Sequence, residues 1–169
     1  GNRSFLRHGD DGQSRRGYAS GGRAISSENR VRENPMTETE QKEQIVRCIR
    51  MLEHNGILDY NGHASIRLPD NRMLINTGSC QRSQLTVDDI CEIDFDGNVL
   101  AGEGKPPLEF HLHAGVYKAR PDIDSVIHAH PNWSTILSTA GVEYLPVYAQ
   151  GSLVYPLPVL DSPDSINNP

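Results

Sequence analysis

Residues 119–131 read Ala-Arg-Pro-Asp-Ile-Asp-Ser-Val-Ile-His-Ala-His-Pro, and this stretch joins the end of a helix to a strand that carries two histidines. Pro121 closes the helix, because proline cannot continue one and restricts the residue before it. The β-branched residues that follow predict a strand over 125–130, in which side chains two apart point to the same face. His128 and His130 are therefore expected to converge on one point.

Helix and strand signals alternate in the rest of the chain, which predicts an α/β fold. The sequence Thr-Glu-Thr-Glu at 37–40 is a capping box, and apolar residues then recur at helical spacing until Gly56 offers a C-terminal stop. A turn at 69–71 joins two strands into a hairpin. We expect strands at 64–68, 73–75 and 90–95, and helices at 107–119 and 132–138.

Residues 1–35 differ chemically from the rest of the chain. They contain seven arginines, no lysine and four acids, a net charge of +3, which leaves 9 bases against 18 acids for residues 36–169. Their Gly, Ser, Arg and Asn residues show no apolar period. We interpret them as a disordered leader or an expression remnant, with Met36 as a candidate natural start.

The remaining composition limits the classes of partner and compartment. No signal peptide and no apolar run of the ~18 residues that a membrane span needs is present, so we expect a soluble, cytoplasmic protein. The acidic body argues against nucleic acid and anionic membranes as partners. Three cysteines without Cys-x-x-Cys spacing predict free thiols.

Two imidazoles at strand period suit a divalent metal such as zinc, although a catalytic zinc usually has three protein ligands. His128 and His130 could instead be two structural histidines, since histidine is often only a satisfied polar residue. Glu109, nineteen residues before His128, is either a helix-start acid or a carboxylate that moves protons beside the metal. For His113 we favour helix packing over a third metal ligand.

Seven pieces of sequence together are similar to one known family: Gly62-His-Ala-Ser-Ile-Arg67, Leu85-Thr86, Ile93-Asp94, Glu109, Tyr117, Ala119-Arg-Pro-Asp122 and Val126-Ile-His-Ala-His-Pro131. Over about residues 40–169 the chain resembles the class II aldolase/adducin family. The resemblance implies a three-layer α/β/α sandwich around a mainly antiparallel mixed sheet, assembled as a homotetramer. It also implies a lyase that depends on zinc or, alternatively, manganese and cleaves a carbon–carbon bond next to a carbonyl.

Matched to the family position by position, His128 and His130 are two of its three metal ligands and Glu109 is its acid/base residue. The resemblance places the third histidine downstream of Pro169. Asn168-Pro169 has the pattern of a helix start. We therefore expect the family domain, residues 36–169, to be incomplete at its C-terminus.

The expected substrate follows from two departures from the family's sugar-phosphate aldolases. Those enzymes carry Gly-Asn and Ser-Ser where this chain has Gly62-His63 and Pro107-Leu108. Only Thr77, Gly78 and Ser79 remain as an anion-friendly loop, so the resemblance favours a non-phosphorylated substrate. His63 resembles the pattern of members that decarboxylate hydroxylated aromatic acids.

The sequence thus predicts a metal-dependent carbon–carbon lyase, an aldolase or a decarboxylase, acting on a small hydroxy-carbonyl or hydroxy-aromatic carboxylate. Glu109 would move the proton, while His63, Thr77, Gly78 and Ser79 would bind the substrate. Two alternatives stay open: an adducin-like interaction module without catalysis, and an inactive truncated remnant.

Overall fold

The computed structural model describes residues 36–158, so the predictions for residues 1–35 and for a helix start at Asn168-Pro169 lie outside the described part. The first helix, α1 (Glu38–His54), begins with the predicted capping box. The Thr37 amide donates to Glu40 Oε2 at 2.7 Å, and the Glu40 amide donates to Thr37 Oγ1 at 3.3 Å. These reciprocal bonds satisfy two amides that a helix leaves without partners.

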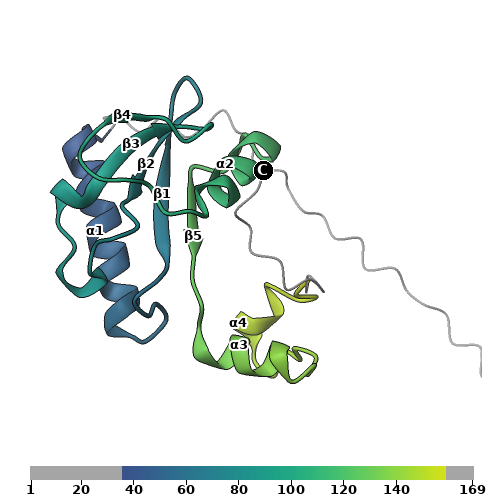
Figure 1. The fold of residues 1–169 in the computed structure, drawn as a ribbon. Helices are drawn as coiled ribbons and strands as arrows, with labels where there is room; N and C mark the ends of the chain where they lie inside the picture. Colours follow the sequence, from purple (N-terminus) through teal and green to yellow (C-terminus); the bar gives the residue numbers. More distant parts are fainter. Residues whose placement is uncertain (1–35, 159–169) are drawn as a thin grey trace, which may run out of the picture. The chain divides into compact units, whose positions relative to one another are not determined.

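Five strands form one sheet in the order β4-β3-β2-β1-β5, and each neighbouring pair is antiparallel (Figure 1). The strands are β1 (His63–Leu68), β2 (Arg72–Asn76), β3 (Ile90–Asp94), β4 (Val99–Ala101) and β5 (Ser125–His128). The predicted β1–β2 hairpin is present. Asp70 and Asn71 turn it with φ of 59° and 57°, a conformation that short polar side chains tolerate.

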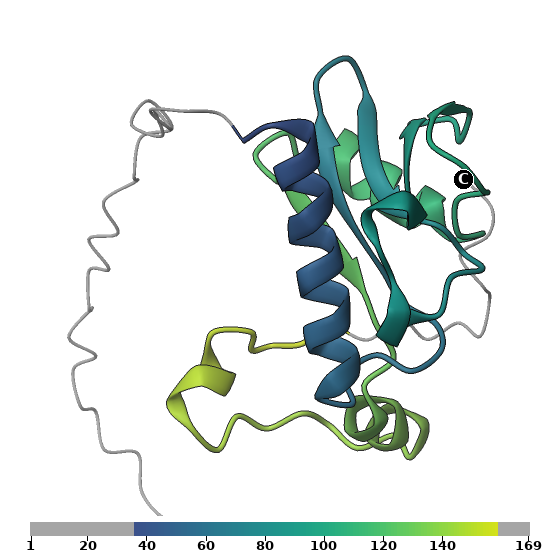
Figure 2. The same ribbon diagram turned by 90° about the vertical axis from the view of Figure 1, so that its left-hand side faces the viewer.

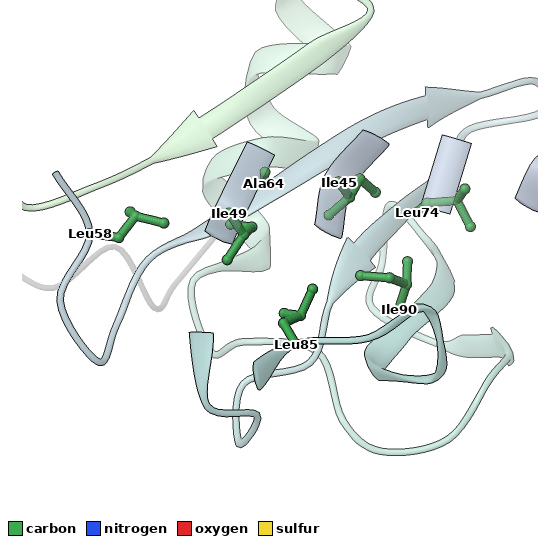
Figure 3. Close-up of a cluster of buried hydrophobic side chains, with 7 residues drawn as sticks. All are labelled: Ile45, Ile49, Leu58, Ala64, Leu74, Leu85 and Ile90. Carbon is green, nitrogen blue, oxygen red and sulfur yellow. The ribbon is translucent and has the colours of Figure 1, made fainter. Parts of the chain in front are cut away.

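A helix covers each face of the sheet, which confirms the predicted three-layer fold. Figure 2 shows α1 in front of the sheet and α2 (Phe110–Ala119) behind it. Strand alternation divides the core between the two faces: Leu74 packs in the α1 layer, whereas its neighbours Met73 and Ile75 pack in the α2 layer. The buried side chains of the α1 layer, drawn in Figure 3, are Ile45, Ile49, Leu58, Ala64, Leu74, Leu85 and Ile90.

Two predicted boundaries near the histidine motif were wrong. The helix expected over 107–119 begins at Phe110, because the Phe110 amide bonds to the Pro107 carbonyl and forms a turn before the helix, with Glu109 at the N-cap. The strand expected over 125–130 ends at His128. Its partner β1 begins at His63, which pairs with His128, so the ladder has no partner residues beyond that point.

The segment after β5 contains two short helices, α3 (Asn132–Thr139) and α4 (Ala149–Ser152). Large apolar side chains of this segment are exposed, among them Trp133 (77%) and Val147 (88%). Within the described range 36–158, no helix combines the length and the apolar character that crossing a bilayer requires.

The three cysteines are free thiols, as predicted. Cys48 and Cys80 are half-buried, and Cys91 lies in the α2 layer of the core. Burial raises the pKa of the Cys91 thiol to about 11, so this group is inert at neutral pH.

Leu74→Ala should lower the free energy of unfolding by about 3 kcal/mol, because it removes a fully buried side chain between α1 and the sheet. Urea unfolding followed by circular dichroism measures this. Leu100→Ala is the matched control: its side chain is 51% exposed, and its effect should stay below about 0.5 kcal/mol. Equal losses in the two variants would contradict the placement of the core.

Candidate active site

Three elements bring a carboxylate and two imidazoles together. His63 begins β1 and His128 ends β5, and the two residues lie directly opposite each other in the antiparallel register. Glu109 stands at the N-cap of α2, on the face of the sheet that α2 covers. Its Oε2 atom lies 3.3 Å from His63 Nε2 and 3.3 Å from His128 Nε2. One carboxylate oxygen is therefore shared between two rings that stack with centroids 4.7 Å apart.

His130 joins this cluster from beyond the end of the strand. Its Nε2 lies 2.8 Å from His128 Nε2, with the two rings nearly perpendicular. The two histidines of the motif thus meet, although only His128 belongs to β5. The extended chain that follows the strand keeps the two-residue alternation of side chains for one more step.

The donor atoms of this cluster fit a divalent metal. The ligand atoms of His63, Glu109 and His128 lie within 4.8 Å of one another, and imidazole nitrogen with carboxylate oxygen is a donor set that zinc and manganese accept. Burial lowers the pKa of His128, which keeps the ring in the neutral form that a metal requires. His128 and His130 would hold the ion through their Nε2 atoms, which lie 2.8 Å apart.

The third metal histidine that the resemblance places downstream of Pro169 stays an expectation. Within the described residues, His63 and Glu109 lie beside His128. No local pattern pointed to this, because His63 precedes His128 by 65 positions and Glu109 by 46. Only the pairing of β1 with β5 and the packing of α2 bring the three together.

A continuous chain of buried hydrogen bonds leads from Glu109 into the core. His63 Nδ1 lies 2.6 Å from His113 Nε2, and His113 Nδ1 lies 2.6 Å from Ser65 Oγ. Ser65 Oγ in turn lies 2.7 Å from the Tyr117 hydroxyl. Apart from Glu109, every member of the chain is at most 2% exposed. His113 thus packs in the core, as expected, and both of its ring nitrogens make hydrogen bonds there.

The direction of donation along this chain follows from its carboxylate end. A carboxylate only accepts, so His63 Nε2 donates to Glu109 and the neutral ring accepts at Nδ1. His113 then donates from Nε2 and accepts at Nδ1 from the Ser65 hydroxyl, which accepts from the Tyr117 hydroxyl. Each buried group is satisfied in its neutral form, and the tautomers of both rings are determined.

The protonation states agree with this order. Burial lowers the pKa of His63 to about 4, although its hydrogen bond with Glu109 opposes this, and burial lowers the pKa of His113 to about 3. Neighbouring histidines lower both pKa values further. Burial raises the pKa of Tyr117 to about 12. At neutral pH both imidazoles are uncharged and the phenol is protonated.

Next to this cluster lies an open pocket of about 460 Å³. It is lined by Asn61, Gly62, His63, Gly78, Ser79, Arg82, Pro106, Pro107, Leu108 and Glu109. The pocket therefore contains His63, Gly78, Ser79 and Glu109 of the predicted site.

The loop at 77–79 supplies fewer anion-binding groups than its sequence suggests. Thr77 is buried behind the pocket, where its amide donates to the Asp89 carbonyl at 2.8 Å. The Gly78 amide donates to the Lys105 carbonyl at 3.1 Å. Ser79 is exposed at the pocket wall. Arg82, which lines the same pocket, was missed at the sequence level, since an arginine between polar residues carries no distinctive pattern.

Residues 43–163 match the family model described as the Class II Aldolase and Adducin N-terminal domain. This match covers well over half of the 169 residues.

Individual relatives agree with the family match. An L-fuculose phosphate aldolase from Methanocaldococcus jannaschii is 38% identical over 104 residues, which are 62% of this chain and 56% of that protein. A 3,4-dihydroxyphthalate decarboxylase from Arthrobacter keyseri is 33% identical over 123 residues, 68% of this chain and 50% of that protein. A solved L-fuculose 1-phosphate aldolase matches with a TM-score of 0.58 and 27% identity, over 63% of this chain and 51% of that one. The chain spans about half the length of the curated relatives it matches.

Acid should destabilise the fold through the buried imidazoles. Because the folded pKa values of His63 and His113 lie near 4 and 3, below the ~6.5 of an unfolded histidine, the unfolded chain binds more protons as the pH falls. Stability is therefore complete above pH ~6.5 and should fall below it, by up to ~1.4 kcal/mol per pH unit for each ring. Urea unfolding between pH 7 and 4.5 with a chelator measures the slope.

His113→Asn should flatten this slope, whereas His54→Asn, a matched change at an exposed histidine, should leave it unchanged. A wild-type stability that stays flat across this range would contradict the neutral, buried state of both rings.

Proposed function

We propose that this chain, which belongs to the class II aldolase and adducin family, acts as a metal-dependent lyase that cleaves a carbon–carbon bond of a small substrate. The relatives include an aldolase and a decarboxylase, and both reactions leave negative charge on carbon that must be stabilised and then protonated. One observation carries the proposal: a single Glu109 oxygen lies 3.3 Å from two imidazoles at the edge of an open pocket.

His128 and His130 would hold the divalent ion, and Glu109 and His63 lie next to them. When bound, the ion supplies Lewis-acid stabilisation of developing oxygen charge. We expect zinc, with manganese as the alternative, because nitrogen donors outnumber carboxylates in this cluster.

Glu109 would carry the proton between solvent and the reacting carbon. It is half-buried and borders the pocket, so its carboxyl group can reach a substrate there. His63 donates a hydrogen bond to the same oxygen that faces His128. Its tautomer is held by His113, so the His63 N–H orients the carboxylate and keeps its second oxygen free for the proton.

The pocket wall beside Glu109 suits a substrate with an apolar or aromatic body. Pro106, Pro107 and Leu108 line it, and the Leu108 side chain is 79% exposed at its mouth. A hydrocarbon at this position offers no hydrogen-bond donor to a phosphate dianion, whereas it can pack against a ring. The substrate class that fits is a non-phosphorylated hydroxy-carbonyl compound or a hydroxylated aromatic acid.

An adducin-like interaction module and an inactive remnant remain the alternatives. Neither requires a carboxylate shared between two imidazoles or a hydrogen-bond chain that determines the tautomer of one of them. This geometry favours the enzyme. A homo-oligomer, a tetramer by resemblance to the family, is the assembly we propose.

Metal analysis of the purified chain tests the ligand assignment. We expect close to one divalent ion per chain, lost in His128→Ala because a catalytic zinc usually has three protein ligands and the variant removes one of the two assigned here. The matched control is His54→Ala, an exposed histidine at the end of α1. Wild-type protein that stays metal-free after incubation with zinc and with manganese would contradict the assignment.

Turnover tests the role of Glu109. Glu109→Gln should retain most of the metal and lose about 10²- to 10⁴-fold in the rate of the chemical step, while Glu103→Gln, at an exposed position, should match the wild type. Carbon dioxide release from hydroxylated aromatic acids and cleavage of a hydroxy-carbonyl panel are the assays. Activity restricted to sugar phosphates, or loss of water without carbon–carbon cleavage, would show that the substrate class or the reaction is wrong.

A further inference from the structure

Arg82 is a buried cation that no carboxylate of residues 36–158 pairs with. Its side chain is 3% exposed. Nε donates to the Gly62 carbonyl at 2.7 Å, and Nη1 donates to the Cys80 carbonyl and lies 3.2 Å from the Cys80 sulfur. The guanidinium therefore joins the loop before β1 to the loop after β2 through neutral acceptors only. A buried charge without an opposite charge is costly.

The remaining nitrogen of the Arg82 guanidinium is Nη2. It has no hydrogen-bond partner within residues 36–158, yet in that same range every buried side-chain nitrogen and oxygen has one. Nη2 therefore reaches open space, and Arg82 lines the pocket that Glu109 also lines.

We propose that Arg82 is the specificity-determining residue of this pocket and that it binds a carboxylate of the substrate through its free Nη2 edge, beside Ser79. This inference rests on the proposed lyase function and names the substrate class more closely. The guanidinium is held rigid by the Gly62 and Cys80 carbonyls, so a bound carboxylate is placed without the entropic cost of ordering a long side chain.

A carboxylate fits better than a phosphate because few donors remain. The Gly78 amide is occupied by the Lys105 carbonyl, and Leu108 carries no donor. Arg82 and Ser79 together match the two oxygens of a planar carboxylate. Glu53 and Asp59 line the adjoining cavity, which Arg82 also borders. Their charges would repel a phosphate group, which carries two charges at Arg82, more strongly than a carboxylate group, which carries one there.

The carboxylate at Arg82 is one that the reaction retains. A strong ion pair with a departing carboxylate would stabilise the ground state over the transition state and slow decarboxylation. The substrate is therefore either a dicarboxylic acid that loses one carboxyl group beside Glu109, or a hydroxy-keto acid whose single carboxylate stays intact during carbon–carbon cleavage.

Calorimetric binding of two probes to the purified, zinc-loaded full chain tests this. The probes are 3,4-dihydroxybenzoate and 3,4-dihydroxybenzamide, which share both hydroxyl groups and differ in charge. The wild type should bind the acid about 10- to 100-fold more tightly than the amide, as expected for a charge-assisted hydrogen bond. Arg82→Gln should remove this preference and leave the affinity for the amide unchanged, and Arg82→Lys should retain part of it.

Equal affinity of the wild type for the two probes would overturn the proposal. A folded Arg82→Gln variant that binds both the acid and the amide more weakly would also overturn it, because such a result would show that Arg82 has a purely structural role. Inorganic phosphate that competes as strongly as the acid would overturn the assignment to a carboxylate. If Arg82→Gln does not fold, the proposal is still tested by the wild-type preference for the acid over the amide and by the reduction of that preference in Arg82→Lys. Binding needs no turnover, so a chain that selects the acid without cleaving any substrate would contradict the lyase and not Arg82.

Discussion

The hydrogen bond between Ser65 Oγ and His113 Nδ1, 2.6 Å long and fully buried, is the interaction on which the site depends. It joins β1 to α2 across the core, and α2 carries Glu109 at its N-cap. Polar groups at this depth must be paired, because an unpaired one costs more than the bond itself contributes. The helix can therefore occupy only the position in which His113 finds both Ser65 and His63, and this position places Glu109.

The sheet supplies the second constraint. Because His63 and His128 are opposite each other on β1 and β5, a shift of one residue in this register would send one ring to the α1 side of the sheet. Packing in both layers opposes such a shift: Ala64 belongs to the α1 layer and Val126 packs in the α2 layer. Hydrophobic packing thus holds the register in which His63 and His128 lie opposite each other.

The sequence predicted local features better than the site. The capping box at 37–40 and the β1–β2 turn depend on residues within four positions of each other, so their patterns are visible in the chain. The proximity of His63 to Glu109 and the burial of Arg82 arise from contacts between distant segments, and no spacing records them. The strand end at His128 was missed for the same reason, because it depends on where β1 begins.

Gly62 has a consequence for how this site tolerates change. Its φ is +95°, and a Cβ atom there would lie 2.3 Å from Leu58 Cδ2 and 3.1 Å from the His128 carbonyl oxygen. The same residue gives its carbonyl to Arg82. A random-mutagenesis survey would therefore find that this position, which has no reactive group, tolerates few substitutions. An added Cβ would press on Leu58 and on the His128 carbonyl, and it would strain the backbone whose carbonyl accepts from Arg82.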